Sequence, residues 1–207
     1  MSDGTFEYVY RDAQCTCTAD YLLPILQELL ESAPTSAVIA DAGCGNGSIL
    51  GRLWRDGWEM HGIEASQSGI EHATRAFPRI RFHAADLSAP LPMFDLVDKC
   101  DFVVTTEVIE HVFLPRVFAM NCYRLLKPNG TLIVSTPYHG YLKYLALAIA
   151  GKFDSHLNPL WDYGHIKFWS RHTLTCLLEE TGFKVTQFRG AGRLPYLWKS
   201  MVLVATK

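Results

Sequence analysis

The pattern of apolar and polar positions predicts a chain in which short strands alternate with helices. Apolar runs of strand length, several of them rich in β-branched residues, occur at 37–41, 58–63, 80–84, 100–106 and 131–136. Helical segments are predicted between and after these runs, at 20–32, 48–55, 66–77, 115–127 and 171–181. We expect Asp20 to cap the first helix, and the run Lys127-Pro128-Asn129-Gly130 to close the fourth.

This alternation favours an α/β fold: a Rossmann-like, doubly wound sheet of seven mostly parallel strands with helices on both faces. The last two strands, at 183–188 and 201–205, have no full helix between them, so we expect an antiparallel last strand at the sheet edge. Residues 1–207 are interpreted as a single domain. The segment at 138–169 is too long for an ordinary loop and is predicted to be a lid or acceptor-binding insertion.

Composition and charge narrow the class of protein. The chain has 207 residues, 49% of them hydrophobic, and a net charge of −2 without a long basic run, which disfavours an extensive nucleic-acid surface. The longest lipid-like run, 141–150, is too short to span a bilayer, which needs about 20 residues. The polar, acidic start Met1-Ser2-Asp3-Gly4 does not resemble a secretory signal, so we expect a cytoplasmic protein.

The six cysteines are predicted to be reduced thiols. They lie scattered along the chain, at Cys15, Cys17, Cys44, Cys100, Cys122 and Cys176. Three of them fall inside apolar stretches, where a free thiol behaves as a small buried hydrophobic group. Cys15 and Cys17 form the only close pair, and no second pair completes a zinc site.

A glycine-rich turn follows the first predicted strand, with the sequence Asp41-Ala42-Gly43-Cys44-Gly45-Asn46-Gly47. Glycines let the backbone bend sharply and let a ligand approach where a Cβ would collide. A dinucleotide fingerprint would place Gly or Ala at the position of Ser48. The acidic Asp41 suits a cationic sulfonium and ammonium ligand better than a phosphate. The alternative is a tight strand–helix turn that binds nothing.

Two further acids follow the next predicted strands. Glu64 ends the second strand, where a carboxylate can accept both hydroxyls of a ribose. Asp86 follows the third strand, where it can accept a hydrogen bond from an adenine amino group. Taken singly, Glu64 could be a solvated acid and Asp86 a helix cap. Because ligands bind at the carboxyl ends of parallel strands, the turn and both acids are expected at one edge.

In this order and spacing, the motifs resemble those of class I S-adenosylmethionine-dependent methyltransferases over nearly the whole chain. The resemblance implies S-adenosylmethionine as cofactor. It also implies a set of cofactor-binding residues: Asp41, Gly43, Cys44, Gly45, Asn46 and Gly47 at the methionine part, Glu64 and Ala65 at the ribose, Asp86 and Leu87 at the adenine, and Thr106 and Glu107 at the methionine end.

The segment Glu107-Val108-Ile109-Glu110-His111 holds the candidate acceptor chemistry. If it is helical, Glu107, Glu110 and His111 share one face, and with His165 they could bind a divalent cation. This arrangement is similar to that of ubiquinone-biosynthesis O-methyltransferases and of small-RNA terminal 2′-O-methyltransferases. The simpler interpretation, which the sequence favours, has no metal: Glu107 contacts the cofactor, and His111 is the general base or a pocket wall.

The predicted insertion is rich in aromatic side chains, namely Tyr138, His139, Tyr141, Tyr144, Trp161, Tyr163, Phe168 and Trp169. Apolar walls with a few polar groups suit an aromatic or lipophilic acceptor. The residues at 141–147 are at the same time expected to form a helix that packs mostly on the core.

The sequence thus predicts methyl transfer from S-adenosylmethionine to the oxygen of a small aromatic or lipophilic acceptor. His111 is the first candidate for the catalytic base and His165 the second, since an imidazole titrates near neutral pH. Two alternatives stay open. One is an RNA 2′-O-methyltransferase, which the near-neutral charge disfavours. The other is a non-catalytic cofactor-binding protein.

Overall fold

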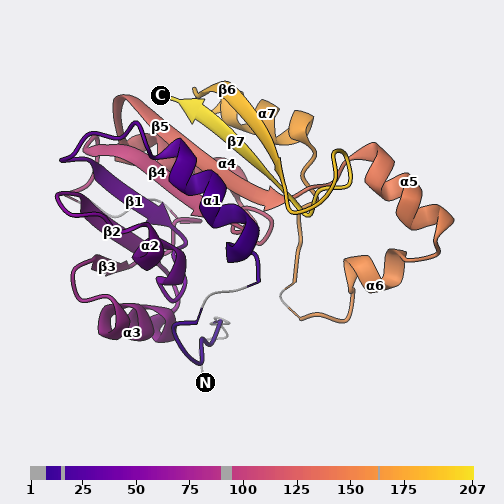
Figure 1. Ribbon diagram of the computed structural model, residues 1–207, viewed down its shortest axis with the longest axis horizontal. Coiled ribbons are helices and arrows are strands. Elements are labelled where there is room, and N and C mark those ends of the chain that lie inside the picture. Colours follow the sequence, from indigo (N-terminus) through magenta and orange to yellow (C-terminus); the bar gives the residue numbers. More distant parts are fainter. Residues whose placement is uncertain (1–7, 15–16, 90–94, 163) are drawn as a thin grey trace.

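One sheet of seven strands organises the computed structural model, which describes residues 8–14, 17–89, 95–162 and 164–207 (Figure 1). The strand order is β3-β2-β1-β4-β5-β7-β6. The first five strands of this order are parallel, and β7 is antiparallel to both of its neighbours. The predicted doubly wound α/β fold with an antiparallel last strand is confirmed. The strands are β1 (Val38–Ala42), β2 (Glu59–Glu64), β3 (Arg81–Ala84), β4 (Cys100–Thr106), β5 (Leu126–Pro137), β6 (Lys184–Ala191) and β7 (Ser200–Thr206).

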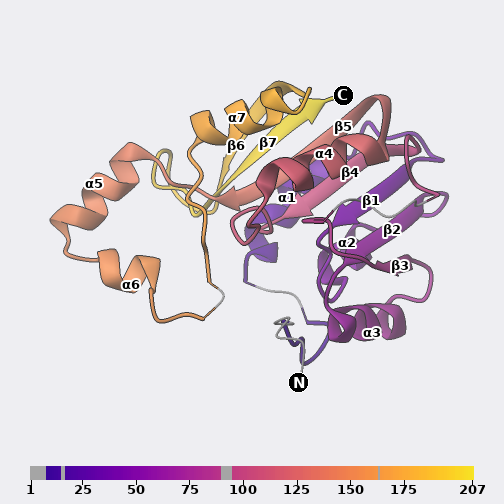
Figure 2. The ribbon, with the colours of Figure 1, turned by 180° about the vertical axis from the view of Figure 1, so that it is seen from behind.

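Helices cover both faces of this sheet, as Figures 1 and 2 show from opposite sides. α1 (Ala19–Leu29) and α2 (Ser48–Leu53) pack on one face, whereas α4 (Pro115–Leu125) and α7 (Arg171–Glu180) pack on the other. α3 (Gln67–Ala76) lies against β2 and β3. Because right-handed crossovers connect the parallel strands, the chain switches sides of the sheet between β1 and β4.

The alternation of side chains along each strand builds the two halves of the core. Ile39 of β1 belongs to the apolar cluster that contains Leu22 of α1, whereas the next residue, Ala40, belongs to the cluster that contains Phe118 of α4. Successive strand residues point to opposite faces, so a sheet covered on both sides needs continuous apolar strands. The sequence has such strands, and the burial of β1 and β7 follows from them.

The first helix differs from its prediction at both ends. It begins at Ala19, so Asp20 lies within the first turn and is not the N-cap. A carboxylate there still interacts favourably with the positive end of the helix dipole. The helix ends at Leu29 and not near Ser32.

The fifth strand is longer than predicted because no loop separates it from α4. The helix ends at Leu125 and β5 begins at the next residue, whereas the prediction began the strand at Thr131. The run at 127–130, predicted to close the helix, lies inside the strand. The pairing of β5 with β4 shifts register between Cys100 and Phe102, which accommodates these extra residues.

The insertion after β5 forms two helices, α5 (Tyr141–Ile149) and α6 (Phe153–Leu157), that project away from the sheet (Figures 1 and 2). The expectation that α5 packs mostly on the core is wrong, since Tyr141 and Ile149 are each 80% exposed. Its buried residue is Lys143, whose Nζ donates a hydrogen bond to the carbonyl of Tyr138 at 2.8 Å. Tyr163 of the predicted aromatic set lies outside the described residues.

The described cysteines are free thiols, as predicted, but Cys176 in the apolar part of α7 is only half-buried and Cys17 is exposed. The thiols of Cys44, Cys100 and Cys122 are free and buried, whereas Cys15 lies outside the described residues.

None of the helices in the described ranges is long and apolar enough to cross a membrane.

Candidate functional site

The glycine-rich turn connects β1 to α2 at the carboxyl edge of the parallel strands. Gly43, Gly45 and Gly47 all have positive φ angles, of 81°, 54° and 73°. The amides of Gly43 and Cys44 both donate to the carbonyl of Ile63 on β2, at 2.8 and 3.1 Å. A Cβ added to Gly43 would lie 2.7 Å from a methyl group of Val108. The turn therefore needs glycine both for its backbone conformation and for close packing.

Gly43→Ala is expected to destabilise the fold and weaken cofactor binding. The left-handed conformation alone costs an alanine roughly 1–2 kcal/mol, and the clash with Val108 adds to this cost. Gly151→Ala is the matched control, because Gly151 also has a positive φ (61°) but nothing lies within 4 Å of an added Cβ. Urea unfolding should show a larger loss for Gly43→Ala than for Gly151→Ala. Equal losses would contradict the role of packing at Gly43.

Asp41 lies at the end of β1, directly before this turn. Its side chain is buried, with 1% exposure, and its Oδ1 atom has no hydrogen-bond partner among the described residues. Burial, and then the nearby carboxylate of Glu64, raise the pKa of Asp41 to about 7. A buried carboxylate oxygen without a donor is costly, so this atom is suited to a ligand that supplies one.

Glu64 ties the glycine turn to the end of β2. Its Oε2 accepts a hydrogen bond from the amide of Gly45 at 2.8 Å, and its Oε1 accepts one from the amide of Ser66 at 2.9 Å. Each carboxylate oxygen can accept a second hydrogen bond. Glu64 is thus fixed in place with acceptor capacity left over, as the predicted ribose contact requires.

Five of the predicted cofactor residues, Gly43, Glu64, Ala65, Asp86 and Leu87, line one pocket with a volume of ≈ 210 Å³, and the other predicted cofactor residues are not part of its lining. Asp86, at this pocket, accepts hydrogen bonds through Oδ1 from the amide and hydroxyl of Ser88, at 2.7 and 2.6 Å. This local turn holds the carboxyl group at the pocket rim. The pocket is lined by Gly43, Ile63, Glu64, Ala65, Ala85, Asp86, Leu87, Ser88, Val108, His111, Val112, Phe113 and Phe118.

Glu107 follows Thr106 at the end of β4 and has a positive φ of 55°. Its Oε1 accepts a hydrogen bond from the hydroxyl of Ser135 at 2.8 Å, and its Oε2 accepts one from Ser200 at 3.0 Å. Burial raises the pKa of Glu107, and these two hydrogen bonds oppose the rise. The carboxylate is therefore held by β5 and β7.

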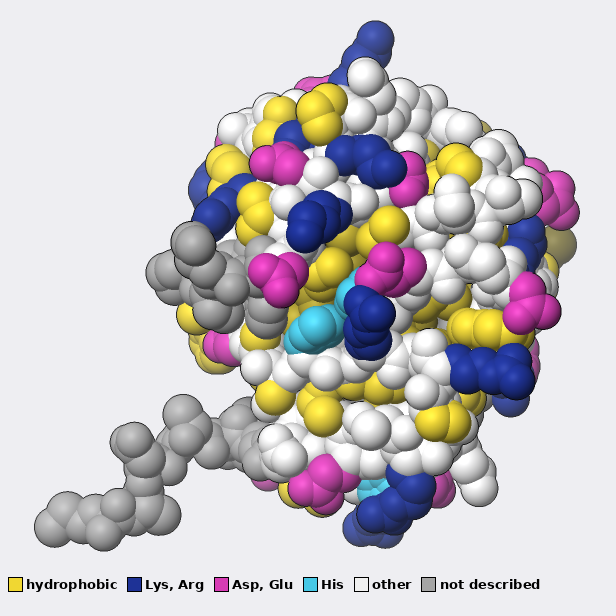
Figure 3. Space-filling model, turned by 90° about the vertical axis from the view of Figure 1, so that its left-hand side faces the viewer, with side chains coloured by type: hydrophobic (Ala, Val, Ile, Leu, Met, Phe, Trp, Pro, Cys, Tyr) yellow, Lys and Arg dark blue, Asp and Glu magenta, His cyan; other side chains and the backbone are white. Residues whose placement is uncertain are grey.

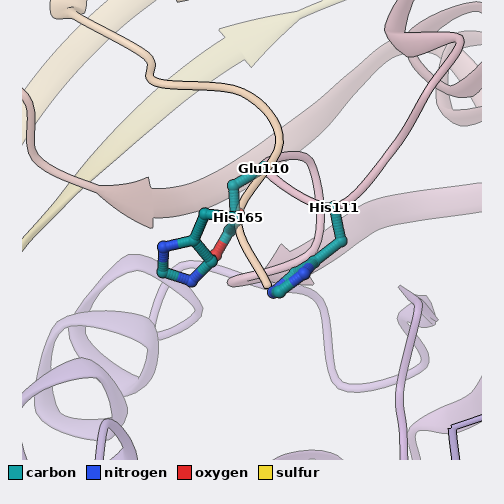
Figure 4. A group of neighbouring side chains, drawn as sticks. All are labelled: Glu110, His111 and His165. Carbon is teal, nitrogen blue, oxygen red and sulfur yellow. The ribbon is translucent and has the colours of Figure 1, made fainter. Parts of the chain in front are cut away.

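Three of the four predicted metal ligands, Glu110, His111 and His165, lie close together, and Glu107, the fourth, is not part of this group. One ligand atom from each of Glu110, His111 and His165 lies within 4.8 Å of the others, and Figure 4 shows the three side chains gathered from two segments. The residues from 107 to 111 form a turn instead of a helix, so the helical face on which the prediction depended does not exist.

Glu110 is the most buried member of this group, which we call the Glu110 cluster. Its side chain is 0% exposed; Oε2 accepts a hydrogen bond from Thr136 at 3.0 Å, and Oε1 has no hydrogen-bond partner in the described part of the chain. His165 Nε2 lies 4.0 Å from Oε1. Burial, and then the like charge of Glu107, raise the pKa of Glu110.

Backbone contacts bring the insertion to this cluster. The amides of Ile166 and Lys167 both donate to the carbonyl of Glu110, at 2.9 and 3.0 Å, and the indole of Trp169 donates to the carbonyl of Ile109 at 3.3 Å. The rings of His165 and His111 are 4.9 Å apart. Burial, and then His111, lower the pKa of His165 to about 4.

Sequence reasoning missed the residues that hold these acids. Ser135, Thr136 and Ser200 are buried polar residues inside apolar strands, and each donates to Glu107 or Glu110. Hydroxyl residues that interrupt an apolar run were the available signal, since a buried hydroxyl needs a partner. Tyr10 was missed as well, although its ring packs against the glycine turn.

A model of the methyltransferase domain family matches residues 11–188, a range that contains the glycine turn, the pocket and the Glu110 cluster. The chain belongs to the methyltransferase domain family. The resemblance to class I S-adenosylmethionine-dependent methyltransferases is confirmed, and the family implies S-adenosylmethionine as methyl donor.

Relatives of this methyltransferase domain include ubiquinone biosynthesis O-methyltransferases, at a distance. That of Bradyrhizobium diazoefficiens is 31% identical over 163 residues, which cover 76% of this chain and 62% of the relative. That of Rickettsia conorii is 27% identical over 189 residues, which cover 91% of this chain and 65% of the relative. The chain spans less than two thirds of the length of these relatives.

Solved structures show the same fold. Magnesium protoporphyrin IX methyltransferase from Synechocystis PCC 6803, solved with bound SAH, matches with a TM-score of 0.68 and 18% sequence identity. The match covers 90% of this chain and 82% of that chain.

Proposed function

We propose that this methyltransferase domain transfers a methyl group from S-adenosylmethionine to a hydroxyl oxygen of a small aromatic or lipophilic acceptor. One observation carries the proposal: Gly43, Glu64 and Asp86 line the same pocket as His111. The shared lining supports the proposal, because His111 is the candidate base and the other three residues are suited to the donor. The aromatic Trp161, whose ring lies 5.9 Å from that of His111, supports an aromatic or lipophilic acceptor.

The donor half of the site fits a nucleoside joined to a charged amino acid. Asp86 and Glu64 supply acceptors for adenine and ribose, and the buried Asp41 supplies the unpaired oxygen for an ammonium group. When bound, S-adenosylmethionine supplies an electrophilic methyl group on a sulfonium. The residues around the site would hold donor and acceptor in a fixed orientation, because orientation supplies much of the rate enhancement in such a displacement.

The acceptor half of the site must either remove the proton of the acceptor hydroxyl or make this proton easier to lose. His165 is neutral near pH 7, since its pKa is lowered to about 4. A base with so low a pKa is weak. Where no cation is bound, His111, which unlike His165 lines the donor pocket, is therefore the candidate for direct proton removal. His165 then acts by accepting a hydrogen bond from the acceptor.

We further propose that the Glu110 cluster holds a divalent cation. The support is the orphaned Oε1 of Glu110 and a donor set of one carboxylate and two imidazoles, which suits borderline divalent metals. A cation bound there would lower the pKa of a coordinated acceptor hydroxyl. Glu110, His111 and His165 would be its protein ligands, and Glu107 would remain with Ser135 and Ser200.

Labelled methyl transfer to catechol-type and to simple phenolic acceptors, with and without a chelator, tests both proposals. We expect catechol-type acceptors to be methylated at least about tenfold faster, because two vicinal oxygens can chelate one cation. A chelator should remove this advantage, and added Mn²⁺ or Zn²⁺ should restore it. Full activity with the chelator would contradict the cation and leave His111 as the base. Transfer to no acceptor, despite binding of S-adenosylhomocysteine, would favour the non-catalytic alternative.

An RNA acceptor is less well supported. On the face of the molecule seen in Figure 3, the Lys and Arg side chains of the described residues are interspersed with Asp and Glu and form no continuous basic surface. Binding of RNA by phosphate contacts would need such a surface and would weaken steeply with salt. A salt-sensitive gel shift with short RNA would revive this alternative.

A further inference from the structure

Residues 8–14, which we call the N-terminal strap, lie across the glycine turn and the start of α3. The side-chain amide of Asn46, in the turn, donates to the carbonyls of Asp12 and Gln14, both at 2.9 Å. Asn46 is itself buried, with 7% exposure. The strap is therefore fastened to the loop that forms one wall of the donor site.

A second set of contacts fastens the strap to α3. The hydroxyl of Ser66, the N-cap of α3, donates to the carbonyl of Tyr8 at 2.6 Å, and the amide of Tyr10 donates to the hydroxyl of Ser68 at 3.0 Å. Ser66 also donates its amide to Glu64. The same short segment thus holds the predicted ribose contact and the strap.

These contacts place the ring of Tyr10 against two glycines, Gly45 of the glycine turn and Gly69 of α3. A Cβ on Gly45 would lie 2.6 Å from the hydroxyl oxygen of Tyr10, and a Cβ on Gly69 would lie 3.1 Å from its ring. Tyr10 is partly buried, whereas Tyr8 and Val9 are 55% and 69% exposed. The side chain of Tyr10 thus points towards the protein, whereas those of Tyr8 and Val9 point towards solvent.

The surroundings of the Tyr10 hydroxyl are acidic. Burial, and then the carboxylate of Glu64, raise the pKa of Tyr10, and Asp41 acts in the same direction. The phenol therefore stays protonated at neutral pH and can donate a hydrogen bond. Asp41 and Gly45 do not belong to the pocket lined by Glu64 and Asp86. A methyl donor that reaches from Asp86 past Glu64 to Asp41 must extend beyond this pocket. It would then reach the part of the glycine turn that Tyr10 covers.

We infer that the N-terminal strap is the outer wall of the donor site and that the hydroxyl of Tyr10 contacts the bound donor beside Glu64. This inference rests on the proposed donor site, because it assigns the donor's amino-acid end to the side of Asp41. It adds a binding residue and a wall of the site that the glycine motif does not contain.

Calorimetry with S-adenosylhomocysteine on the full chain tests the contact with Tyr10. Tyr10→Phe keeps the ring and removes the hydroxyl, and it should raise the dissociation constant about five- to tenfold. Tyr10→Ala should raise it further. Tyr8→Phe, in the same strap but with an exposed ring, is the control and should bind within about twofold of wild type. Thermal unfolding without ligand shows whether each variant folds.

Trypsin cleavage after Arg11 tests whether the bound donor holds the strap in place, since Arg11 is exposed in the strap. Saturating S-adenosylhomocysteine should slow this cleavage in the wild type and in Tyr8→Phe, and slow it less in Tyr10→Phe. If the wild type binds S-adenosylhomocysteine while Tyr10→Phe binds equally well and cleavage is unchanged, the inference is overturned and the donor site stands. If the wild type does not bind it, the proposed donor site fails, and the inference fails with it.

Discussion

Asp41→Asn is expected to weaken binding of S-adenosylhomocysteine by about 100-fold, because a charge-assisted hydrogen bond to the ligand's ammonium group is lost in a buried site. The amide keeps the shape of the side chain, so the pocket should survive. Calorimetry at pH 8 measures the loss. Asp20→Asn, at an exposed position on α1, is the matched control and should bind as the wild type does. Binding by Asp41→Asn within threefold of wild type would show that Asp41 does not hold the ligand.

The same substitution should stabilise the protein at high pH. The pKa of Asp41 is raised from 3.8 to about 7 in the folded protein. A raised pKa favours the folded state below pH 3.8, and this advantage is lost as the pH rises through about 7. Above pH 7 the wild type keeps a buried charge that Asn lacks. Urea unfolding should show the free energy of unfolding of Asp41→Asn rising relative to that of the wild type between about pH 4 and pH 7, by at most roughly 1.4 kcal/mol for each pH unit.

Affinity for the donor should depend on pH in the opposite sense. The anion of Asp41 is the form that pairs with an ammonium group, so affinity for S-adenosylhomocysteine should rise as the pH passes through about 7. The rise should be absent in Asp41→Asn. Function and stability therefore make opposite demands at this position, which is common for buried charges in binding sites.

Glu110→Gln should lower kcat by about 100-fold or more and leave the affinity for S-adenosylhomocysteine within about twofold. Glu110 is fully buried, and one oxygen faces His165 without a hydrogen-bond partner in the described residues. An amide in its place cannot act as an anionic ligand to a cation, nor can it balance a positive charge that develops on His111 or His165. Rates with labelled S-adenosylmethionine and a catechol-type acceptor measure the effect.

Glu31→Gln, at an exposed position, is the control for Glu110→Gln and should leave kcat unchanged. Adding Mn²⁺ at high concentration separates the two roles of Glu110. Partial recovery of kcat would indicate a weakened cation site, and no recovery would indicate an electrostatic role. A Glu110→Gln variant with more than a tenth of the wild-type rate would remove Glu110 from the proposed mechanism.

Much of the fold could be predicted because its signals are local. Apolar runs such as Cys100–Thr106 are long enough for a buried strand, and the structure places β4 at these residues. The exposure of α5 could not be predicted, because its apolar sequence does not show whether another element covers it. The early start of β5 depends on a register shift against β4, which is a contact between distant segments.

The sequence by itself determined the sheet, the glycine turn and the acids at the strand ends, since each follows from the preferences of a short segment. Tertiary structure alone decided which partners each acid has. Glu107 and Glu110 are three positions apart, yet Ser135 and Ser200 hold Glu107, whereas Glu110 is left with an open oxygen beside His165. Tertiary structure likewise placed Tyr10 over Gly45. The physical reason is that hydrogen bonds and burial depend on partners far along the chain, and no local pattern records them.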